Sequence, residues 1–196
     1  MPSSEPRAPR KPFVHHRPTG DVADDFYWLG DRDDADTIAY LEAENRHADE
    51  WFAPHDQLIE TIFGEIKSRI QETDQSVPTL KDGWWYVTRT EEGADYAIHC
   101  RGRSRETATE NLLLDENEEA AGHEYFSIGA FDVSPNGNLL AWSSDTDGSE
   151  HFTMRIRDLV SGLDLVDVIA DTSWAGTAWS ADSQHLFYVT YDEQER

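Results

Sequence analysis

The sequence is poor in cysteine, and this limits its covalent chemistry. Cys100 is the only cysteine among 196 residues, so no internal disulfide bond can form and nothing indicates an oxidising compartment. It lies in the strand-like run 96–101, without a partner at metal-ligand spacing. We therefore interpret Cys100 as a packed thiol rather than a nucleophile.

Basic residues are scarce as well. Lys and Arg together number 16 against 40 Asp and Glu, which gives a formal net charge of −24. This balance excludes a broad nucleic-acid-binding surface and disfavours binding to anionic membranes. Two interpretations stay open for the acidic excess. We favour a solvated surface over a field that steers cationic substrates, and salt adaptation is one form that such a surface takes.

The N-terminus has no apolar stretch. Residues 1–20 are rich in proline and basic residues, so they match neither a signal peptide nor a membrane anchor. Proline also denies this stretch regular hydrogen bonding. We expect residues 1–20 to be a flexible arm and the protein to be cytoplasmic.

Several motifs that carry chemistry are missing. The eight histidines include no H-E-x-x-H pair, and there is no phosphate loop, dinucleotide fingerprint or G-x-S-x-G nucleophile elbow. The acidic run 31–36 with Glu42 has the spacing of a calcium loop, but Asp36 stands where that loop needs glycine. Helix capping is the favoured interpretation. We name no catalytic or metal-binding residue, and the substrate-binding residues are unknown.

What the sequence does contain is aromatic and periodic. With 7 Trp, 7 Tyr and 8 Phe it is globular despite its charge. Residues 33–52 have the apolar spacing of an amphipathic helix. A second helix follows Pro54 and carries one apolar stripe that needs a partner surface, made of Leu58, Ile59, Ile62, Phe63, Ile66 and Ile70.

From Trp84 onward the apolar period changes to two, which predicts strands. Runs 84–89 and 96–101 form a hairpin, and 112–114 adds a third short strand. A complete four-strand unit follows over 127–133, 139–144, 152–157 and 165–169. Five tryptophans stand at the spacing of strand residues, namely Trp84, Trp85, Trp142, Trp174 and Trp179. We therefore predict that they pack in the core between blades rather than form a binding platform.

The four-strand unit begins a second time. Residues 131–145 and 177–192 align at a constant offset of 46, with Ser134 on Ser180 and Leu140 on Leu186. A repeat of this length built from short strands is typical of a propeller blade. The second copy stops after two strands, and an unpaired edge of that kind invites association. We expect the chain alone to be poorly soluble or self-associated, which sizing chromatography would test.

Five stretches together resemble the prolyl oligopeptidase family of serine peptidases, and most closely its branch that cleaves after Arg or Lys. The likeness runs in unbroken order from about Asp24 to the end, through DDFYWLGDRDD (24–34), YLEAEN (40–45), EIKSRIQETDQSVP (65–78), YVTRTEEGADYAIHCR (86–101) and GAFDVSPNGNLLAWSSDTDGSEHFTMRIRDLVSG (129–162).

The resemblance implies a mainly β fold: a partial β-propeller of two blades and the start of a third, preceded by an N-terminal two-helix segment that in the family packs on an α/β-hydrolase domain. It divides the chain into an arm (1–20), a docking segment (21–78) and an incomplete propeller (79–196). The family's Ser/Asp/His triad belongs to the absent hydrolase domain, so we expect this chain alone to be inactive.

Further expectations about ligands follow from the same resemblance. It implies short basic peptides as substrates of the complete enzyme, the chain's own hydrolase domain as its partner, and no cofactor. We expect no nucleic-acid or membrane partner. The alternative is a non-enzymatic, propeller-type module for protein interaction, because fold alone does not determine function.

Overall fold

The computed structural model describes residues 5–174 and 176–191, which divide into two compact units. The first unit extends to Ile70 and is mainly helical, and the second begins at Gln71 and consists of sheets. Within the described residues, no helix is long and apolar enough to cross a membrane.

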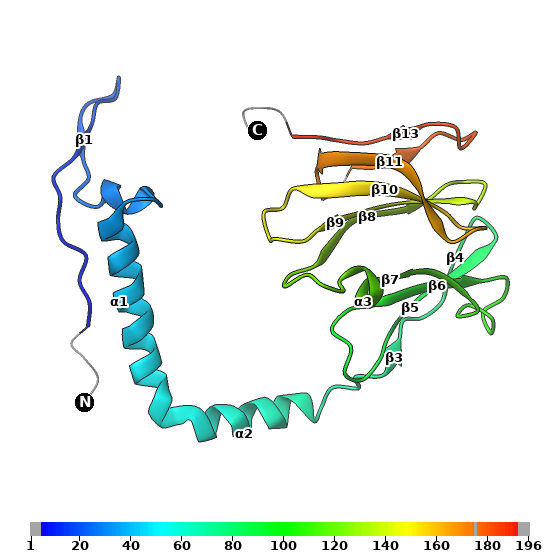
Figure 1. Ribbon diagram of the computed structural model, residues 1–196, viewed down its shortest axis with the longest axis horizontal. Coiled ribbons are helices and arrows are strands. Elements are labelled where there is room, and N and C mark those ends of the chain that lie inside the picture. Colours follow the sequence, from blue (N-terminus) through cyan, green and yellow to red (C-terminus); the bar gives the residue numbers. More distant parts are fainter. Residues whose placement is uncertain (1–4, 175, 192–196) are drawn as a thin grey trace. The chain divides into compact units, whose positions relative to one another are not determined.

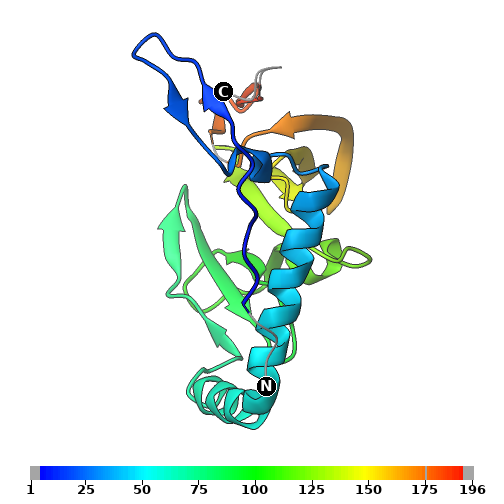
Figure 2. The same ribbon diagram turned by 90° about the vertical axis from the view of Figure 1, so that its left-hand side faces the viewer.

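The helical unit contains the two helices that the sequence predicts. These are α1 (Ala35–Phe52) and α2 (Asp56–Lys67), joined by the short 3-10 helix η2 (Ala53–His55), which holds Pro54 and where the chain bends sharply (Figure 2). Asp34 caps α1, because its Oδ1 accepts the N–H groups of Asp36 at 2.8 Å and Thr37 at 3.1 Å. Capping, rather than calcium binding, is therefore the observed role of Asp34.

The N-terminal stretch contacts the start of the helices. A small antiparallel pair, β1 (Val14–His15) with β2 (Val22–Ala23), precedes the 3-10 helix η1 (Tyr27–Gly30). The Nζ of Lys11 lies 2.6 Å from the Asp36 carboxylate and 4.3 Å from the Trp28 ring centroid, and Phe13 stacks on Tyr27 at 4.0 Å. Lys11 and Phe13, within the stretch expected to form an arm, thus have defined partners.

The sheet unit consists of layers stacked face to face (Figure 1). In the first sheet, β5 (Trp84–Thr90), β6 (Ile98–Gly102) and β7 (Asn111–Asp115) lie in order, and both β3 (Asp74–Gln75) and β4 (Thr79–Lys81) pair with β5. The short helix α3 (Glu116–Glu119) leads to the second sheet.

The second sheet is a four-stranded antiparallel meander. It comprises β8 (Ser127–Val133), β9 (Leu139–Asp145), β10 (Phe152–Asp158) and β11 (Leu163–Thr172), and a two-stranded hairpin of β12 (Ala178–Trp179) and β13 (Leu186–Phe187) follows. These are two blades and the start of a third, as the sequence predicts. β11 extends beyond the predicted 165–169 at both ends.

The offset of 46 is visible in the hydrogen bonds of the two turns. Ser134 Oγ donates to Asn136 Oδ1 and accepts from Leu139 N, while Ser180 Oγ donates to Asp182 Oδ1 and accepts from His185 N. The two copies therefore repeat a turn design as well as a strand pattern.

A shared apolar core joins the first two sheets. It packs residues of β7 and of the loop after α3 against β8 and β9, and its buried members are Leu113, Leu114, Ala120, Phe126, Val133, Leu140 and Trp142. Trp142 is 2% exposed. The free energy gained by burying these apolar side chains exceeds that of any single polar contact between the sheets.

Candidate functional site

Three acidic loops gather at one end of the two sheets. Because the strands are antiparallel, the loops 91–97, 116–126 and 146–151 all lie where β5, β7 and β9 end. None of them contains Lys or Arg. Their exposed carboxylates are those of Glu91, Glu92, Asp95, Glu118, Glu124, Asp147 and Glu150. We call this region the acidic end.

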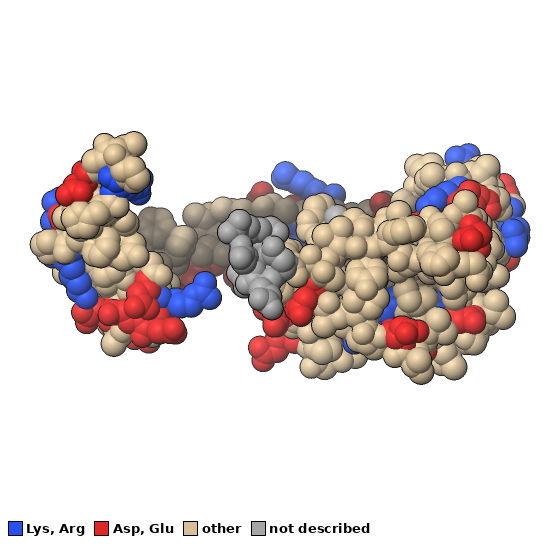
Figure 3. All heavy atoms as spheres, turned by 90° about the horizontal axis from the view of Figure 1, so that it is seen from above, with Lys and Arg blue, Asp and Glu red and all other residues tan. Residues whose placement is uncertain are grey.

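The opposite end has a different charge balance. It carries Arg103 and Arg105 in the loop between β6 and β7, and their guanidinium groups lie over the rings of Trp84 and Trp85 at 3.4 and 5.6 Å. On the face seen in Figure 3, charged side chains of the sheet unit are separated by broad uncharged areas. The acidic end thus differs from the β6–β7 loop in lacking Lys and Arg.

A cavity of about 240 Å³ opens at the acidic end. Its lining includes the aromatic residues Tyr125, Phe152 and Trp174 and the acidic residues Asp145 and Glu150. Trp174 is 65% exposed and Tyr125 is 45% exposed, so both rings are accessible to a ligand. Aromatic faces together with carboxylates attract cationic groups. We call this the aromatic–acidic cavity.

Asp145 is the buried anchor of this cavity. The residue is 2% exposed, and its carboxylate accepts the N–H groups of Asp147, Gly148 and Glu150 at 2.9 to 3.0 Å. Burial opposes ionisation, but these N–H groups together hold the pKa of the Asp145 carboxyl below its ordinary value of 3.8. Asp145 thus fixes the loop that presents Glu150 while remaining charged.

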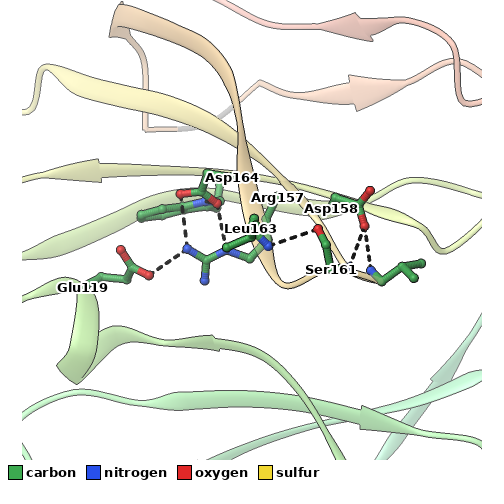
Figure 4. A network of polar contacts seen from close by, with 8 residues as sticks. Glu119, Arg157, Asp158, Ser161, Leu163 and Asp164 are labelled. Carbon is green, nitrogen blue, oxygen red and sulfur yellow. Dashed lines mark hydrogen bonds and ion pairs between the residues drawn. The ribbon is translucent and has the colours of Figure 1, made fainter.

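An ion-pair network holds α3 against the second sheet (Figure 4). Arg157 on β10 donates from Nη2 to Glu119 at 2.8 Å and from Nε to Asp164 at 2.8 Å. Burial lowers the pKa of Arg157, but Asp164 and Glu119 outweigh it and raise that pKa. Glu119 belongs to the loop between the two sheets, so this network fixes part of the acidic end.

The residues considered from sequence do not form a catalytic group. Cys100 is buried at 2% exposure, as the interpretation of a packed thiol predicts. Ser134 and Ser180 serve in turns. Across residues 5–174 and 176–191, no three His, Cys, Asp or Glu side chains are placed to hold a metal ion.

The aromatic–acidic cavity was not found from the sequence. Trp174 was interpreted as inter-blade core, and the structure instead exposes its ring at this cavity. Trp142 is buried in the core, and Trp179 donates to the Asp132 carbonyl at 3.0 Å. The sequence feature that could have indicated this cavity is charge, because all three loops of the acidic end lack Lys and Arg.

Comparison with known proteins decides the family. The model of the N-terminal β-propeller domain of prolyl oligopeptidase matches residues 6–196. The chain belongs to the prolyl oligopeptidase family. Its two sheets and the following hairpin are therefore two blades and the start of a third in the family's propeller.

Relatives in the prolyl oligopeptidase family are peptidases. Dipeptidyl aminopeptidase BI of Pseudoxanthomonas mexicana is 34% identical over 210 residues, covering 98% of this chain and 29% of the relative. Protease 2 of Moraxella lacunata is 32% identical over 198 residues, covering 97% and 29%. The chain thus spans about three tenths of the length of these relatives.

Solved structures of the family have the same fold. Oligopeptidase B from Leishmania major matches with a TM-score of 0.83 at 26% identity, covering 98% of this chain and 30% of that one. Oligopeptidase B from Trypanosoma brucei, with covalently bound antipain in the closed form, matches with a TM-score of 0.81 at 26% identity, covering 98% and 29%.

Proposed function

We propose that this chain is the N-terminal portion of a serine oligopeptidase that hydrolyses short peptides after Arg or Lys. Residues 79–196 supply part of the propeller that limits substrate size, and residues 21–78 dock on the hydrolase domain that carries the triad. The cytoplasm remains the proposed compartment. The chain alone is proposed to be inactive, since a serine hydroxyl needs a positioned base.

The observation that carries the Arg/Lys preference is the acidic end with its aromatic–acidic cavity. A cationic side chain near Glu150 gains charge attraction, while the rings of Tyr125 and Trp174 favour the same sign of charge. An anionic peptide meets repulsion from all three loops. The relatives named oligopeptidase B and Protease 2 support the proposal of peptide hydrolysis.

The docking role rests on the apolar stripe of α2. Leu58, Ile59, Ile62, Phe63 and Ile66 lie in α2, whereas Ile70, expected in the same helix, lies beyond its end at Lys67. All six side chains are at least 44% exposed. Contiguous apolar surface of this kind marks an interaction site. A domain encoded by the remaining seven tenths of the relatives' length is the proposed occupant.

Release of a chromophore from benzoyl-arginine substrates tests the proposal. The complete protein is expected to cleave the arginyl substrate and its lysyl analogue and to leave a matched prolyl substrate nearly intact. The 196-residue chain is expected to cleave none of them. Prolyl cleavage without arginyl cleavage would refute the specificity, and no cleavage at all would favour a non-enzymatic interaction module.

A further inference from the structure

A second cavity, of about 280 Å³, lies between the first and second sheets. It is formed by residues of β4, β5, β6, β7 and β8 and of the link before β4, and it shares no lining residue with the aromatic–acidic cavity. We call it the inter-sheet cavity. Every residue that lines it belongs to the sheet unit, so it does not depend on any other domain.

The inter-sheet cavity lies beside a break in an edge strand. β3 ends at Gln75 and β4 begins at Thr79, because Pro78 has no N–H group to continue the ladder. Across the break Ser76 exchanges hydrogen bonds with Thr88, donating its N–H to the Thr88 carbonyl at 2.8 Å and accepting the Thr88 N–H on Oγ at 3.0 Å. Ser76 is thus fixed against β5 within the break.

The walls of the inter-sheet cavity are mainly apolar and fixed. Tyr86, Val87, Leu113, Phe131 and Val133 line it. Val87, Leu113 and Val133 are at most 8% exposed, so they belong to the packed interior. Such walls accept an aliphatic group and exclude water from it.

His99 forms a rigid polar part of the wall. Its Nε2 lies 2.5 Å from Glu116 Oε1, its Nδ1 lies 3.3 Å from Thr88 Oγ1, and its ring lies 4.5 Å from the Phe131 ring. Both ring nitrogens are therefore engaged within the protein. His99 thus shapes the cavity with a ring held in place on both sides.

One pair of opposite charges completes the lining. Lys81 Nζ and Asp132 Oδ1 are 3.3 Å apart, and their side chains are 59% and 24% exposed. A ligand that carries a single charge of either sign meets a like charge here. A zwitterion matches both groups, with its carboxylate at Lys81 and its ammonium at Asp132.

We infer that the inter-sheet cavity binds a small zwitterion, namely a free amino acid or dipeptide with an aliphatic side chain. The main-chain charges pair with Lys81 and Asp132, and the side chain enters the apolar space behind them. The cavity volume of about 280 Å³ suits a ligand of this size. Pockets for drug-sized ligands, which are larger than a free amino acid or dipeptide, measure roughly 300 to 1,000 Å³.

Calorimetric titration of the protein with glycyl-leucine tests the inference without relying on hydrolysis. One equivalent is expected to bind, and N-acetyl-glycyl-leucine amide, which has the same side chain and no charges, is expected to bind at least about tenfold more weakly. Equal binding of the two compounds, or binding of neither, would overturn the inference. Either result leaves the proposed peptidase function untouched.

Charge variants locate the binding. Asp132→Asn and Lys81→Met are each expected to weaken glycyl-leucine binding by about tenfold or more. Asp95→Asn and Arg105→Met are the matched controls, because both are exposed on the first blade and neither lines the cavity. Unchanged binding in both test variants, with melting temperatures near that of the parent, would place the ligand elsewhere. The blocked dipeptide decides the question even if a variant fails to fold.

Discussion

At the residue scale, Gly137 allows the turn between β8 and β9 to approach Trp84 of the first blade closely, because it has no side chain. It has φ of +77°, and a Cβ there would lie 2.9 Å from Trp84 Nε1 and 3.4 Å from Arg101 Nη1. Gly148 has φ of +80° with open space around it, so it is a matched control. The two positions share backbone strain and differ in crowding.

We therefore predict that Gly137→Ala destabilises the protein more than Gly148→Ala does. Each substitution costs about 1 kcal/mol for the left-handed backbone, and only Gly137→Ala adds an overpacking term of about 1–3 kcal/mol. Urea unfolding measures both. Equal losses of unfolding free energy in the two variants would contradict this, because they would show that the Trp84 side chain moves aside without destabilising the fold.

Asp145 provides a prediction about pH. Asp145→Asn replaces an acceptor of three N–H groups with an amide, so we expect a loss of about 2 kcal/mol at neutral pH. The folded-state pKa lies below 3.8, so the charged form stabilises the fold fully above that value and this contribution disappears as the pH falls through the folded pKa.

The difference in unfolding free energy between parent and Asp145→Asn should accordingly shrink below about pH 4. Unfolding titrations at a series of pH values measure it, with Asp95→Asn as the exposed control. A difference that stays constant down to pH 2 would contradict the role given to the carboxylate charge.

The burial and contacts of individual residues were harder to predict from the sequence than the helices and strands were. The period-two pattern places Trp174 near strands, but its exposure depends on where the loop after β11 runs, which no local pattern specifies. The burial of Asp145 likewise depends on three N–H groups that converge only in the folded loop. The turn residues Ser134 and Ser180 were predictable because their hydrogen bonds are local.

At the element scale, the sequence predicted most of the fold. Both helices and the strands of the two blades follow from apolar periodicity, and the 46-residue offset predicts the third blade's first hairpin. The inter-sheet cavity was beyond prediction, because it arises from a break in one edge strand facing β8 across a sheet interface. Neither sheet reveals it alone.

The proposed docking role of the apolar stripe of α2 can be tested by mutation. Phe63→Glu should change the unfolding free energy of the 196-residue chain by less than about 0.5 kcal/mol, because Phe63 is already 62% exposed. In the complete protein, where we propose that the stripe is buried, it should cost about 2–3 kcal/mol.

Gln57→Glu on the polar face of α2 is the control, since it adds the same charge outside the stripe. Urea unfolding of both proteins makes the comparison. If Phe63→Glu is harmless in the complete protein as well, the docking role of α2 is wrong.

At the scale of the whole molecule, we propose that the distribution of charge contributes to function. The formal charge of −24 leaves a salt-adapted surface and a field that steers cationic substrates as alternatives, and we propose steering by the three loops without Lys or Arg. We predict that kcat/KM of the complete protein for an arginyl peptide falls about threefold or more as ionic strength rises from low to physiological. A neutral substrate, if cleaved, should show little change. Parallel curves for both substrates would remove steering from the account.

We propose that this chain is the N-terminal part of a peptidase of the prolyl oligopeptidase family. Reading the coding sequence downstream of Arg196 tests it most directly. The account predicts an open frame that completes the propeller and then encodes G-x-S-x-G, followed by the triad's Asp and His in that order. A stop codon immediately after Arg196, or a downstream domain without these residues, would contradict it.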